Sequence, residues 1–316
     1  MNTLDSHQLA RLGAKVDPYP PKSAIDPFTT GMPCDLLARV SSFEQLDRID
    51  ARLHRAIDEE RPAYLLVTGR SGSGRSSMAN CIMARYCHHR NLPLDHFILP
   101  NRNAASNCAK LSAFKAWFTA LRNDIFRRKL SLSKNLTERI PEYLKESDDD
   151  TMEANFQYLA LEIAEELRAI GAEGRAPYLF GCCLEDVKSY AIIKAALDIF
   201  REVQTVCIFT VGDYDNERME IIDLFRTKHV GERFVQLHPL LGHDASRLLQ
   251  RRWELLLGSD CPFPFDADEL ATALGDKPRT VGKILTLMNI MLQMKLNSTP
   301  PGEPWPHDPA LRFTAA

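Results

Sequence analysis

The stretch from Tyr64 to Ser77 decides the fold of this chain, and it reads Tyr-Leu-Leu-Val-Thr-Gly-Arg-Ser-Gly-Ser-Gly-Arg-Ser-Ser. Its first four residues, Tyr64 to Val67, are apolar or β-branched and predict a short buried strand. A glycine-rich turn follows from Gly69 to Gly74, and the run from Met78 to Arg90 predicts a helix. A strand, a glycine-rich turn and a helix in this order are the context that a phosphate-binding loop needs.

The spacing within this stretch matches the phosphate-loop pattern G-x-x-x-x-G-K-[ST] at every specified position except the lysine, where the chain has Arg75. Glycines let successive backbone N–H groups point inward, and the following helix adds the positive end of its dipole. The hydroxyl of Ser76 would reach Mg²⁺. The expected nucleotide-binding residues of the loop are Gly69, Ser71, Gly72, Ser73, Gly74, Arg75, Ser76 and Ser77.

Arg75 is the departure from the pattern that matters most. Lysine would place a compact point charge at the β- and γ-phosphates, whereas arginine is longer, planar and forked. The charge is kept, which favours nucleotide binding, but the different shape leaves hydrolysis open. The alternative interpretation is a glycine-rich turn between a strand and a helix that binds no ligand.

Composition and charge are those of an ordinary globular protein. A length of 316 residues leaves room for a nucleotide-sized domain plus a smaller one, or for one large domain. Hydrophobic residues make up 45% of the chain and charged residues 26%. The formal net charge of -3 gives no bulk attraction to nucleic acid, although it is compatible with a local basic patch.

The sequence has neither a run of eighteen apolar residues nor a basic N-terminus followed by an apolar core, so we expect no membrane span and no signal peptide. Several of the eight cysteines lie in apolar runs, among them Cys182, Cys183 and Cys207. This placement is typical of reduced, buried thiols in a cytoplasmic protein.

Five segments have the composition of strands, and helical segments separate them. The expected strands are residues 64–67, 96–99, 178–184, 205–211 and 232–238. The third of them is a continuous apolar run, as central parallel strands show. This alternation predicts an α/β fold with a five-stranded parallel sheet and helices on both of its faces.

The rest of the chain predicts a small all-helical unit and two proline-rich ends. After Pro239 the strands stop, and helical segments follow until about residue 296. We expect an extended N-terminal lead-in at 1–35, a phosphate-loop nucleotide-binding α/β domain at 36–240, a helical domain at 241–296 and a Pro-rich tail at 297–316.

Acidic and polar side chains follow two of the expected strands. Glu185 and Asp186 end the third strand, where one acid can hold Mg²⁺ and its neighbour can polarise an attacking water. We expect Glu185 and Ser76 as metal ligands, and Glu185 and Asp186 as catalytic acids. Thr210 and Asp213, at the end of the fourth strand, are candidates for a place between this acid and the γ-phosphate. Solvated strand ends and polar turns are the alternatives.

Three arginines are candidates for contact with a terminal phosphate. Arg226 and Arg233 lie just before and within the fifth strand segment, where an arginine in a ring of subunits can reach the γ-phosphate of a neighbour. Arg279 lies in the run Gly275-Asp-Lys-Pro-Arg279, which opens the last long helix, and it could point back across a cleft to a phosphate. For Arg226 and Arg233 the alternative is an ordinary surface arginine.

A basic stretch covers residues 122–145. Its cations are Arg122, Arg127, Arg128, Lys129, Lys134, Arg139 and Lys145. It is either a solvated helix face and loop or a surface that contacts the phosphates of DNA.

The order of these pieces resembles the AAA+ ATPases, and specifically their origin-recognition/STAND-like branch. The glycine-rich loop resembles Walker A, Leu184-Glu185-Asp186 resembles Walker B, and the run from Gly275 to Arg279 resembles the sensor-2 motif. The strand segment from Thr205 to Asp213 resembles sensor 1. The resemblance covers about residues 36–296. It implies an α/β nucleotide-binding domain, a small C-terminal helical lid, Mg-ATP, and oligomers that form on ATP binding.

Three functions are compatible with these observations. The first is an ATP-binding molecular switch with slow or residual Mg-ATP hydrolysis, to ADP and phosphate, that assembles with itself or with a partner protein. The second is a nucleotide-free scaffold that keeps the fold and binds other proteins. The third is a DNA-associated helper ATPase of the transposition or replication-initiation kind, which would use the basic stretch.

Overall fold

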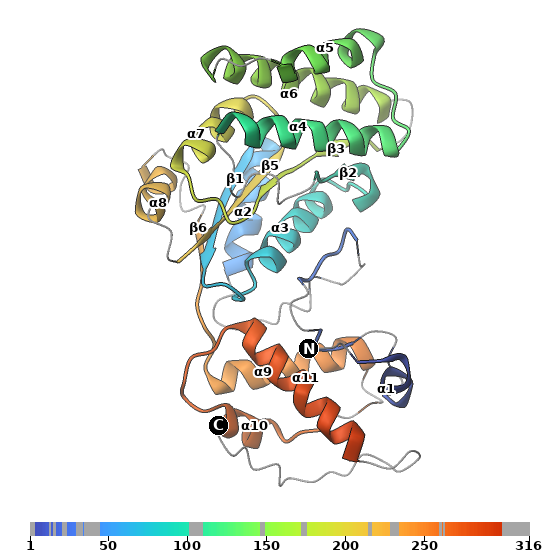
Figure 1. Ribbon diagram of the computed structural model, residues 1–316, viewed down its shortest axis with the longest axis vertical. Coiled ribbons are helices and arrows are strands. Elements are labelled where there is room, and N and C mark those ends of the chain that lie inside the picture. The colour runs from blue at the N-terminus through green and yellow to red at the C-terminus, as the bar shows by residue number, and fades with distance from the viewer. Residues whose placement is uncertain are drawn as a thin grey trace.

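The computed structural model describes most of the chain between residues 4 and 298. The described residues are 4–12, 14, 17–20, 24–29, 34, 45–100, 110–145, 149–171, 176–213, 217–227, 234–258, 261 and 263–298. They form a sheet with helices on both sides and, at the other end of the long axis, a group of helices that includes α9, α10 and α11 (Figure 1). None of the described helices is both long enough and apolar enough to cross a membrane.

The main sheet contains four parallel strands in the order β4-β5-β1-β6 among the described residues. Their bounds are β1 (Ala63–Gly69), β4 (Cys182–Leu184), β5 (Val206–Gly212) and β6 (Phe234–Leu237). The phosphate-loop strand β1 is central and buried along its whole length. The predicted α/β fold with a parallel sheet is confirmed, but the prediction of five strands in that sheet is wrong.

The expected third strand is divided at Gly181. Its first part, β3 (Leu179–Phe180), pairs in parallel with β2 (Phe97–Ile98) as a separate two-stranded sheet, and its second part, β4, pairs with β5. The backbone N–H of Gly181 still donates to the carbonyl of Ile98 at 3.0 Å. A Cβ at Gly181 would lie 2.4 Å from the ring of Phe97, so this ring takes the place of a side chain at the break.

Alternate residues along the strands enter two different cores. Leu65 and Val67 pack with α2 and α3 on one face, and Leu66 and Phe209 pack with α4 to α8 on the other. Because both faces are covered, the strands are mostly apolar and do not alternate regularly with polar residues. The helices of the two cores are α2 (Gln45–Asp58), α3 (Arg75–His89), α4 (Lys110–Arg127), α5 (Lys134–Lys145), α6 (Asp149–Gly171), α7 (Tyr190–Ile199) and α8 (Arg218–Thr227).

The C-terminal helices form a group of their own in Figure 1, and α1 (Ser6–Arg11) lies beside them. They are α9 (Gly242–Leu257), α10 (Ala267–Leu274) and α11 (Val281–Ser298). An antiparallel bridge joins Leu240, which precedes α9, to Arg279, which precedes α11. The backbone hydrogen bonds of this bridge, 2.8 and 2.9 Å long, hold the starts of the two helices together.

Described residues of the N-terminal segment contact the C-terminal helices through buried polar groups. The carboxylate of Asp17 accepts hydrogen bonds from the backbone N–H groups of Leu4 and Tyr19 and from the side-chain amide of Asn289 on α11. The hydroxyl of Tyr19 donates to the carbonyl of Leu249 on α9 at 2.9 Å. Since buried polar groups need partners, these bonds fix the course of the segment over α9 and α11.

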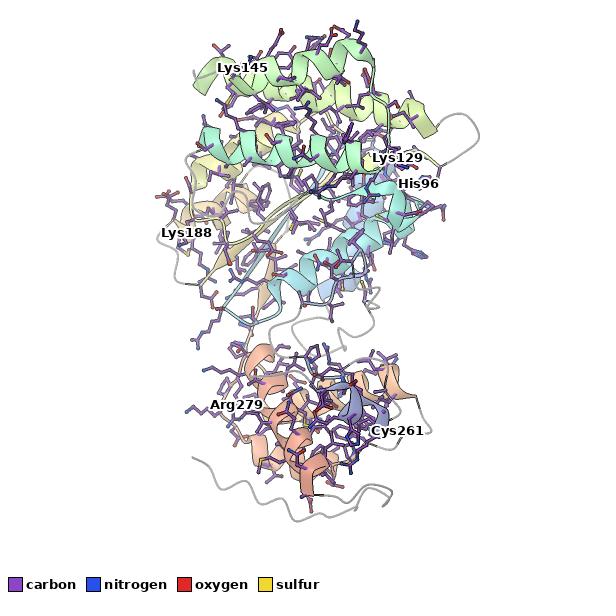
Figure 2. All side chains as sticks on the ribbon, turned by 45° about the vertical axis from the view of Figure 1, so that its right-hand side comes forward. His96, Lys129, Lys145, Lys188, Cys261 and Arg279 are labelled. Carbon is purple, nitrogen blue, oxygen red and sulfur yellow. The ribbon has the colours of Figure 1, made fainter. Side chains whose placement is uncertain are left out.

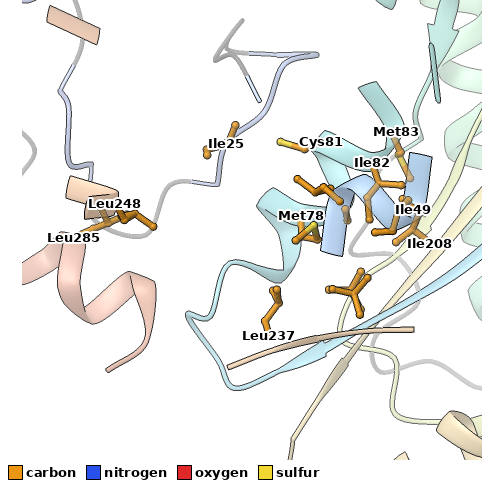
Figure 3. Close-up of a cluster of buried hydrophobic side chains, with 14 of the residues drawn as sticks. Ile25, Ile49, Met78, Cys81, Ile82, Met83, Ile208, Leu237, Leu248 and Leu285 are labelled. Atoms are coloured by element: carbon orange, nitrogen blue, oxygen red, sulfur yellow. The ribbon is translucent and has the colours of Figure 1, made fainter. Parts of the chain in front are cut away.

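The same segment also contacts α3. The N–H of Ile25 donates to the Ser77 hydroxyl at 2.9 Å, and the side-chain amide of Asn80 donates to the carbonyl of Ile25 at 2.7 Å. Figure 3 shows Ile25 between α3 and the side chains of Leu248 and Leu285. One continuous core therefore runs from α2 and α3 past Ile25 into α9 and α11.

Candidate functional site

The glycine-rich loop between β1 and α3 has a conformation that its glycines permit. Gly74, the residue before α3, is left-handed with φ 97° and ψ 19°, and Gly72 has φ 77°. A Cβ at Gly69 would lie 2.5 Å from the Ser73 hydroxyl oxygen and 2.9 Å from the carbonyl oxygen of Leu237. Side chains rarely adopt or fit such positions, so the glycines shape the loop.

The first turn of α3 lies directly behind this loop. Arg75 begins the helix, and its cap Gly74 provides no side-chain acceptor. N–H groups in the first turn of a helix have no intrahelical acceptor, and together they form the positive end of the helix dipole. Of the two following hydroxyls, that of Ser77 accepts from Ile25, whereas half-buried Ser76 lines the pocket described next. The start of α3 is thus suited to an anion.

A pocket of about 690 Å³ opens between the loop, the N-terminal segment and the C-terminal helices. This volume is within the range of small-molecule sites. Four of the charged residues that line it are basic and one is acidic, an excess that favours a negatively charged ligand. They are Arg75, Arg252, Arg279, Lys283 and Asp186.

Arg75 and Asp186 form an ion pair at the mouth of this pocket. One terminal nitrogen of Arg75 lies 2.6 Å from a carboxylate oxygen of Asp186. The Arg75 side chain is only 12% exposed, and its other terminal nitrogen is buried without a hydrogen-bond partner among the described residues. An unsatisfied buried donor costs free energy, which a ligand acceptor that reached this nitrogen would recover.

Thr210 holds the turn that carries Asp186. The buried Thr210 hydroxyl accepts from the N–H of Asp186 at 2.9 Å, and the Thr210 carbonyl accepts from the N–H of Val187 at 2.9 Å. Asp186 itself is left-handed with φ 52°, a conformation in which aspartate is tolerated. Of the residues that the structure describes, Asp186 lines the pocket, and Glu185 and Thr210 do not.

Arg279 lines the pocket from the C-terminal side. Its guanidinium donates to the carbonyl of Leu274 and, at 3.4 Å, to that of Lys277, so it turns back toward the end of α10. Figure 2 labels Arg279 at the side of the group of C-terminal helices. Arg279 thus lines the pocket, and its contact with a phosphate stays a prediction.

Asp213 and the two other candidate arginines have different surroundings. Asp213 is bound by Arg218 at 3.2 Å and approached by Arg70 at 3.9 Å, and it does not line the pocket in the described part of the chain. Arg226 belongs to α8, but its side chain lies outside what the structure describes. Arg233 lies outside the described residues.

The basic stretch lies far from this pocket. Figure 2 shows Lys129 and Lys145 beside the helices at the end of the molecule opposite to Arg279. Several of its cations have local partners: Arg139 pairs with Glu162 at 2.8 Å, and the guanidinium of Arg128 donates to backbone carbonyls, among them that of Phe97 at 3.3 Å. These pairs reduce the charge that the stretch presents.

Sequence reasoning missed the pocket residues of the N-terminal segment and of the C-terminal helices. They are Ala24, Ile25, Leu248, Arg252, Thr280, Val281, Gly282, Lys283, Leu285, Thr286 and Leu287. Helical spacing could have identified Leu248 and Leu285 as buried, but no local pattern distinguishes residues that face a ligand from residues that face the core.

The described part of the chain contains neither a metal-binding cluster nor an activated thiol at Cys87 or Cys182. Burial raises the pKa of the Cys87 thiol to about 12, and burial raises that of Cys182 well above its ordinary value. Such thiols stay protonated and unreactive. The described residues contain no group of three or more His, Cys, Asp or Glu side chains that could hold a metal ion.

No family model and no curated protein sequence matches this chain. Solved structures do resemble it. A chain from the structure of Drosophila ORC bound to DNA is 11% identical and has a TM-score of 0.52; the match covers 97% of this chain and 66% of that one. Cdc6p from Pyrobaculum aerophilum is 14% identical over 82% of this chain and 63% of its own, with a TM-score of 0.48.

A Walker-type ATPase of Pyrococcus abyssi is 11% identical over 81% of this chain and 71% of its own, with a TM-score of 0.45. This chain thus spans less than two thirds of the length of the ORC and Cdc6p chains. Of the three matches, only that to the ORC chain has a TM-score above 0.5, and it shows a likeness of fold. The chain therefore shares the fold of the ORC chain, with a parallel sheet covered by helices, in agreement with the resemblance to AAA+ ATPases that its sequence motifs indicated.

Proposed function

We propose that the chain is a nucleotide-binding molecular switch that binds Mg-ATP in the pocket between the glycine-rich loop and α11. The observation that carries this proposal is the buried, unpartnered nitrogen of Arg75 at the N-terminus of α3. A phosphate oxygen would satisfy this donor, and the glycines leave room for phosphates to approach the backbone N–H groups. The excess of cations around the pocket supports a polyanion as the ligand.

The loop residues fit a nucleotide, and Ser76 is the proposed metal ligand that lines the pocket, whereas Glu185 lies outside the pocket lining. The loop from Gly69 to Gly74 would surround the phosphates, and Arg75 would neutralise them. Ser76, which lines the pocket, and Glu185, at the end of β4, are the proposed ligands of Mg²⁺. Bound Mg²⁺ would supply further positive charge where the phosphates carry negative charge.

We further propose that hydrolysis is slow. Asp186 is the acid proposed to polarise water, and Arg75 already holds its carboxylate at 2.6 Å. While this ion pair persists, that carboxylate oxygen is occupied by the guanidinium and is not available to a water molecule. Thr210 would contribute by fixing the Asp186 turn.

Residues 241–296 are proposed to act as a lid, and assembly is proposed to follow its closure. Arg279 would exchange the carbonyls that it now contacts for a phosphate, which would make the position of the lid depend on the nucleotide. Arg226 and Arg233 are proposed to reach the nucleotide of a neighbouring copy or of a partner protein.

Isothermal calorimetry of Mg-ATP binding tests the proposal. We expect micromolar binding by the wild-type protein, which the double variant Arg75→Ala, Ser76→Ala abolishes. Arg61→Ala is the control, because Arg61 is exposed, approaches Glu59 at 3.8 Å and does not line the pocket in the described part of the chain. Absence of both heat and a thermal shift at millimolar ATP would contradict the nucleotide switch.

The ion pair between Arg75 and Asp186 also favours a second candidate, a nucleotide-free scaffold, because it compensates the charge of the loop without a ligand. The same calorimetry separates the two functions.

A DNA-associated helper ATPase has support from the likeness to a DNA-bound ORC chain. A mobility shift that weakens steeply with salt would support DNA binding, and replacement of Lys129 and Lys145 by Glu should then abolish it.

A further inference from the structure

Arg252 is a buried cation at the nucleotide pocket that no sequence motif explains. It lies on α9, is 3% exposed and lines the pocket. Its Nε donates to the carbonyl of Pro18 at 3.1 Å, so one edge of the guanidinium holds the N-terminal segment. A terminal nitrogen of the same guanidinium is buried, and the part of the chain that the structure describes offers it no partner.

The pocket lining contains polar groups from the glycine-rich loop and α3 and apolar side chains from the N-terminal segment, α9 and α11. We call the loop with Ser76 the polar end, and Ile25, Leu248 and Leu285 the apolar end. Figure 3 shows Leu248 and Leu285 together, with Ile25 toward α3. Arg252 follows Leu248 by four residues, so both side chains lie on the same face of α9.

We infer that Arg252 binds the nucleobase, by donating from its guanidinium to an acceptor atom of a base that lies against Leu248 and Leu285. The inference rests on the proposed function, since it requires that phosphates occupy the polar end. Arg252 would thus give the base site a hydrogen-bond donor from α9, which a purely apolar base site would lack.

The chemistry of the guanidinium supports this role. Arginine carries five N–H donors in a fixed plane, and a purine edge offers ring and exocyclic acceptors that such a fork can reach. Burial lowers the pKa of Arg252, but Tyr19 and Asp17 counteract this effect, and arginine keeps its proton in proteins. A ligand acceptor would therefore meet a charged donor that has already lost its water.

The competing role is purely structural, namely the anchoring of Pro18. The two roles differ in which ligands they affect. A base contact contributes to the binding of a nucleotide but not to that of inorganic tripolyphosphate, which has no base. A structural role affects both ligands equally, through the shape of the pocket, or affects neither.

The experiment compares Mg-ATP, Mg-GTP and Mg-tripolyphosphate binding by calorimetry in wild type, Arg252→Met and Arg252→Lys. Arg252→Met keeps an unbranched, flexible stem without donors, and Arg252→Lys keeps the charge without the fork. Tyr19→Phe is the matched control, because it removes another bond between the N-terminal segment and α9 without changing a pocket residue.

We expect Arg252→Met to lose about tenfold or more in affinity for at least one of the two nucleotides, and none for tripolyphosphate. Arg252→Lys should recover only part of the loss, and Tyr19→Phe should bind all three ligands as wild type does. The nucleotide with the larger loss identifies the base that Arg252 contacts.

Equal losses for nucleotides and tripolyphosphate, or no loss for any ligand, would overturn the inference. So would an equal loss with ribose 5-triphosphate, because the contact would then be to the sugar. If wild type binds nucleotide and Arg252→Met binds it equally well, only this inference fails. If wild type binds none of the ligands, the proposed function fails as well.

Discussion

The backbone N–H of Gly282 donates a 2.8 Å hydrogen bond to the carbonyl oxygen of Gly72. Gly72 is in the turn of the glycine-rich loop, and Gly282 is the second residue of α11, so this bond joins the loop directly to the C-terminal helices. A Cβ at Gly282 would lie 3.3 Å from the Gly72 oxygen, and a Cβ at Gly72 would lie 3.3 Å from the Thr280 hydroxyl. Only glycines at both positions allow this approach without displacement.

Replacement of Gly282 should therefore weaken nucleotide binding. In Gly282→Val the branched side chain meets the Gly72 carbonyl and moves the start of α11 away from the loop. We expect the affinity for Mg-ATP to fall about tenfold, or ~1.4 kcal/mol, in calorimetry. Met294→Ala, which changes a side chain 60% exposed on the same helix, should bind as wild type does. Equal affinities of Gly282→Val and wild type would show that the contact has no part in binding.

Arg75→Lys should increase ATP turnover. The shorter, unforked lysine would release the Asp186 carboxylate, which Arg75 now holds at 2.6 Å. We expect phosphate release at saturating Mg-ATP to rise at least about tenfold, the low end of what general-base catalysis contributes. Arg75→Lys, Asp186→Asn should lose this gain. A single variant that turns over at the wild-type rate would mean that the ion pair does not limit hydrolysis.

Two buried threonines on neighbouring strands should respond differently to the loss of their hydroxyl. Thr210→Val leaves the N–H of Asp186 without its acceptor, so the free energy of unfolding in urea should fall by about 1–2 kcal/mol. The Thr68 hydroxyl on β1 has no hydrogen-bond partner within the described ranges. Thr68→Val should therefore be neutral or stabilising. Similar losses in both variants would assign the effect to packing and exclude the hydrogen bond as its cause.

Alkaline pH should destabilise the fold through Cys87. Burial raises the pKa of this thiol from 9.0 to about 12. Between these values the folded protein keeps a proton that the unfolded chain releases. The contribution of this thiol to the free energy of unfolding is thus fully present below pH 9. It is lost as pH rises toward 12, by about 1.4 kcal/mol per pH unit.

Urea unfolding at pH 8, 9.5 and 10.5 measures this effect. The free energy of unfolding should decline less steeply with pH in Cys87→Ala than in wild type, whatever the difference between the two proteins at pH 8. Tyr86, whose pKa burial raises from 10.0 to about 12, contributes in the same direction, so part of the decline should remain in the variant. Parallel curves for the two proteins would contradict the assignment to Cys87.

The glycine-rich loop could be predicted from sequence because its determinants are local. Gly69, Gly74 and Ser76 lie within one short stretch, and the structure gives that stretch the strand, turn and helix that its composition indicated. The break at Gly181 could not be predicted, since it depends on the ring of Phe97 from a distant part of the chain. An apolar run shows that a strand is buried, but it does not show which neighbour the strand pairs with.

Arg252 and the N-terminal segment were beyond prediction for a related reason. A polar residue in an amphipathic helix normally faces solvent, and only the tertiary structure places Pro18 and a pocket beside Arg252. The segment around Asp17 and Ile25 has many prolines and no periodicity. Its course is fixed by hydrogen bonds to α3, α9 and α11, which a local pattern does not reveal.

The bond between Asp17 and Asn289 has a consequence for the order of folding during synthesis. Its partners are 272 positions apart in the sequence. A ribosome that adds about 5–20 residues per second exposes Asp17 many seconds before Asn289 exists. The strands and helices of the sheet can form in that interval, whereas Ile25, Arg252 and α11 cannot meet until the last helix has been made. The pocket should thus form after the sheet, and a newly made chain should become able to bind nucleotide only once α11 has been made.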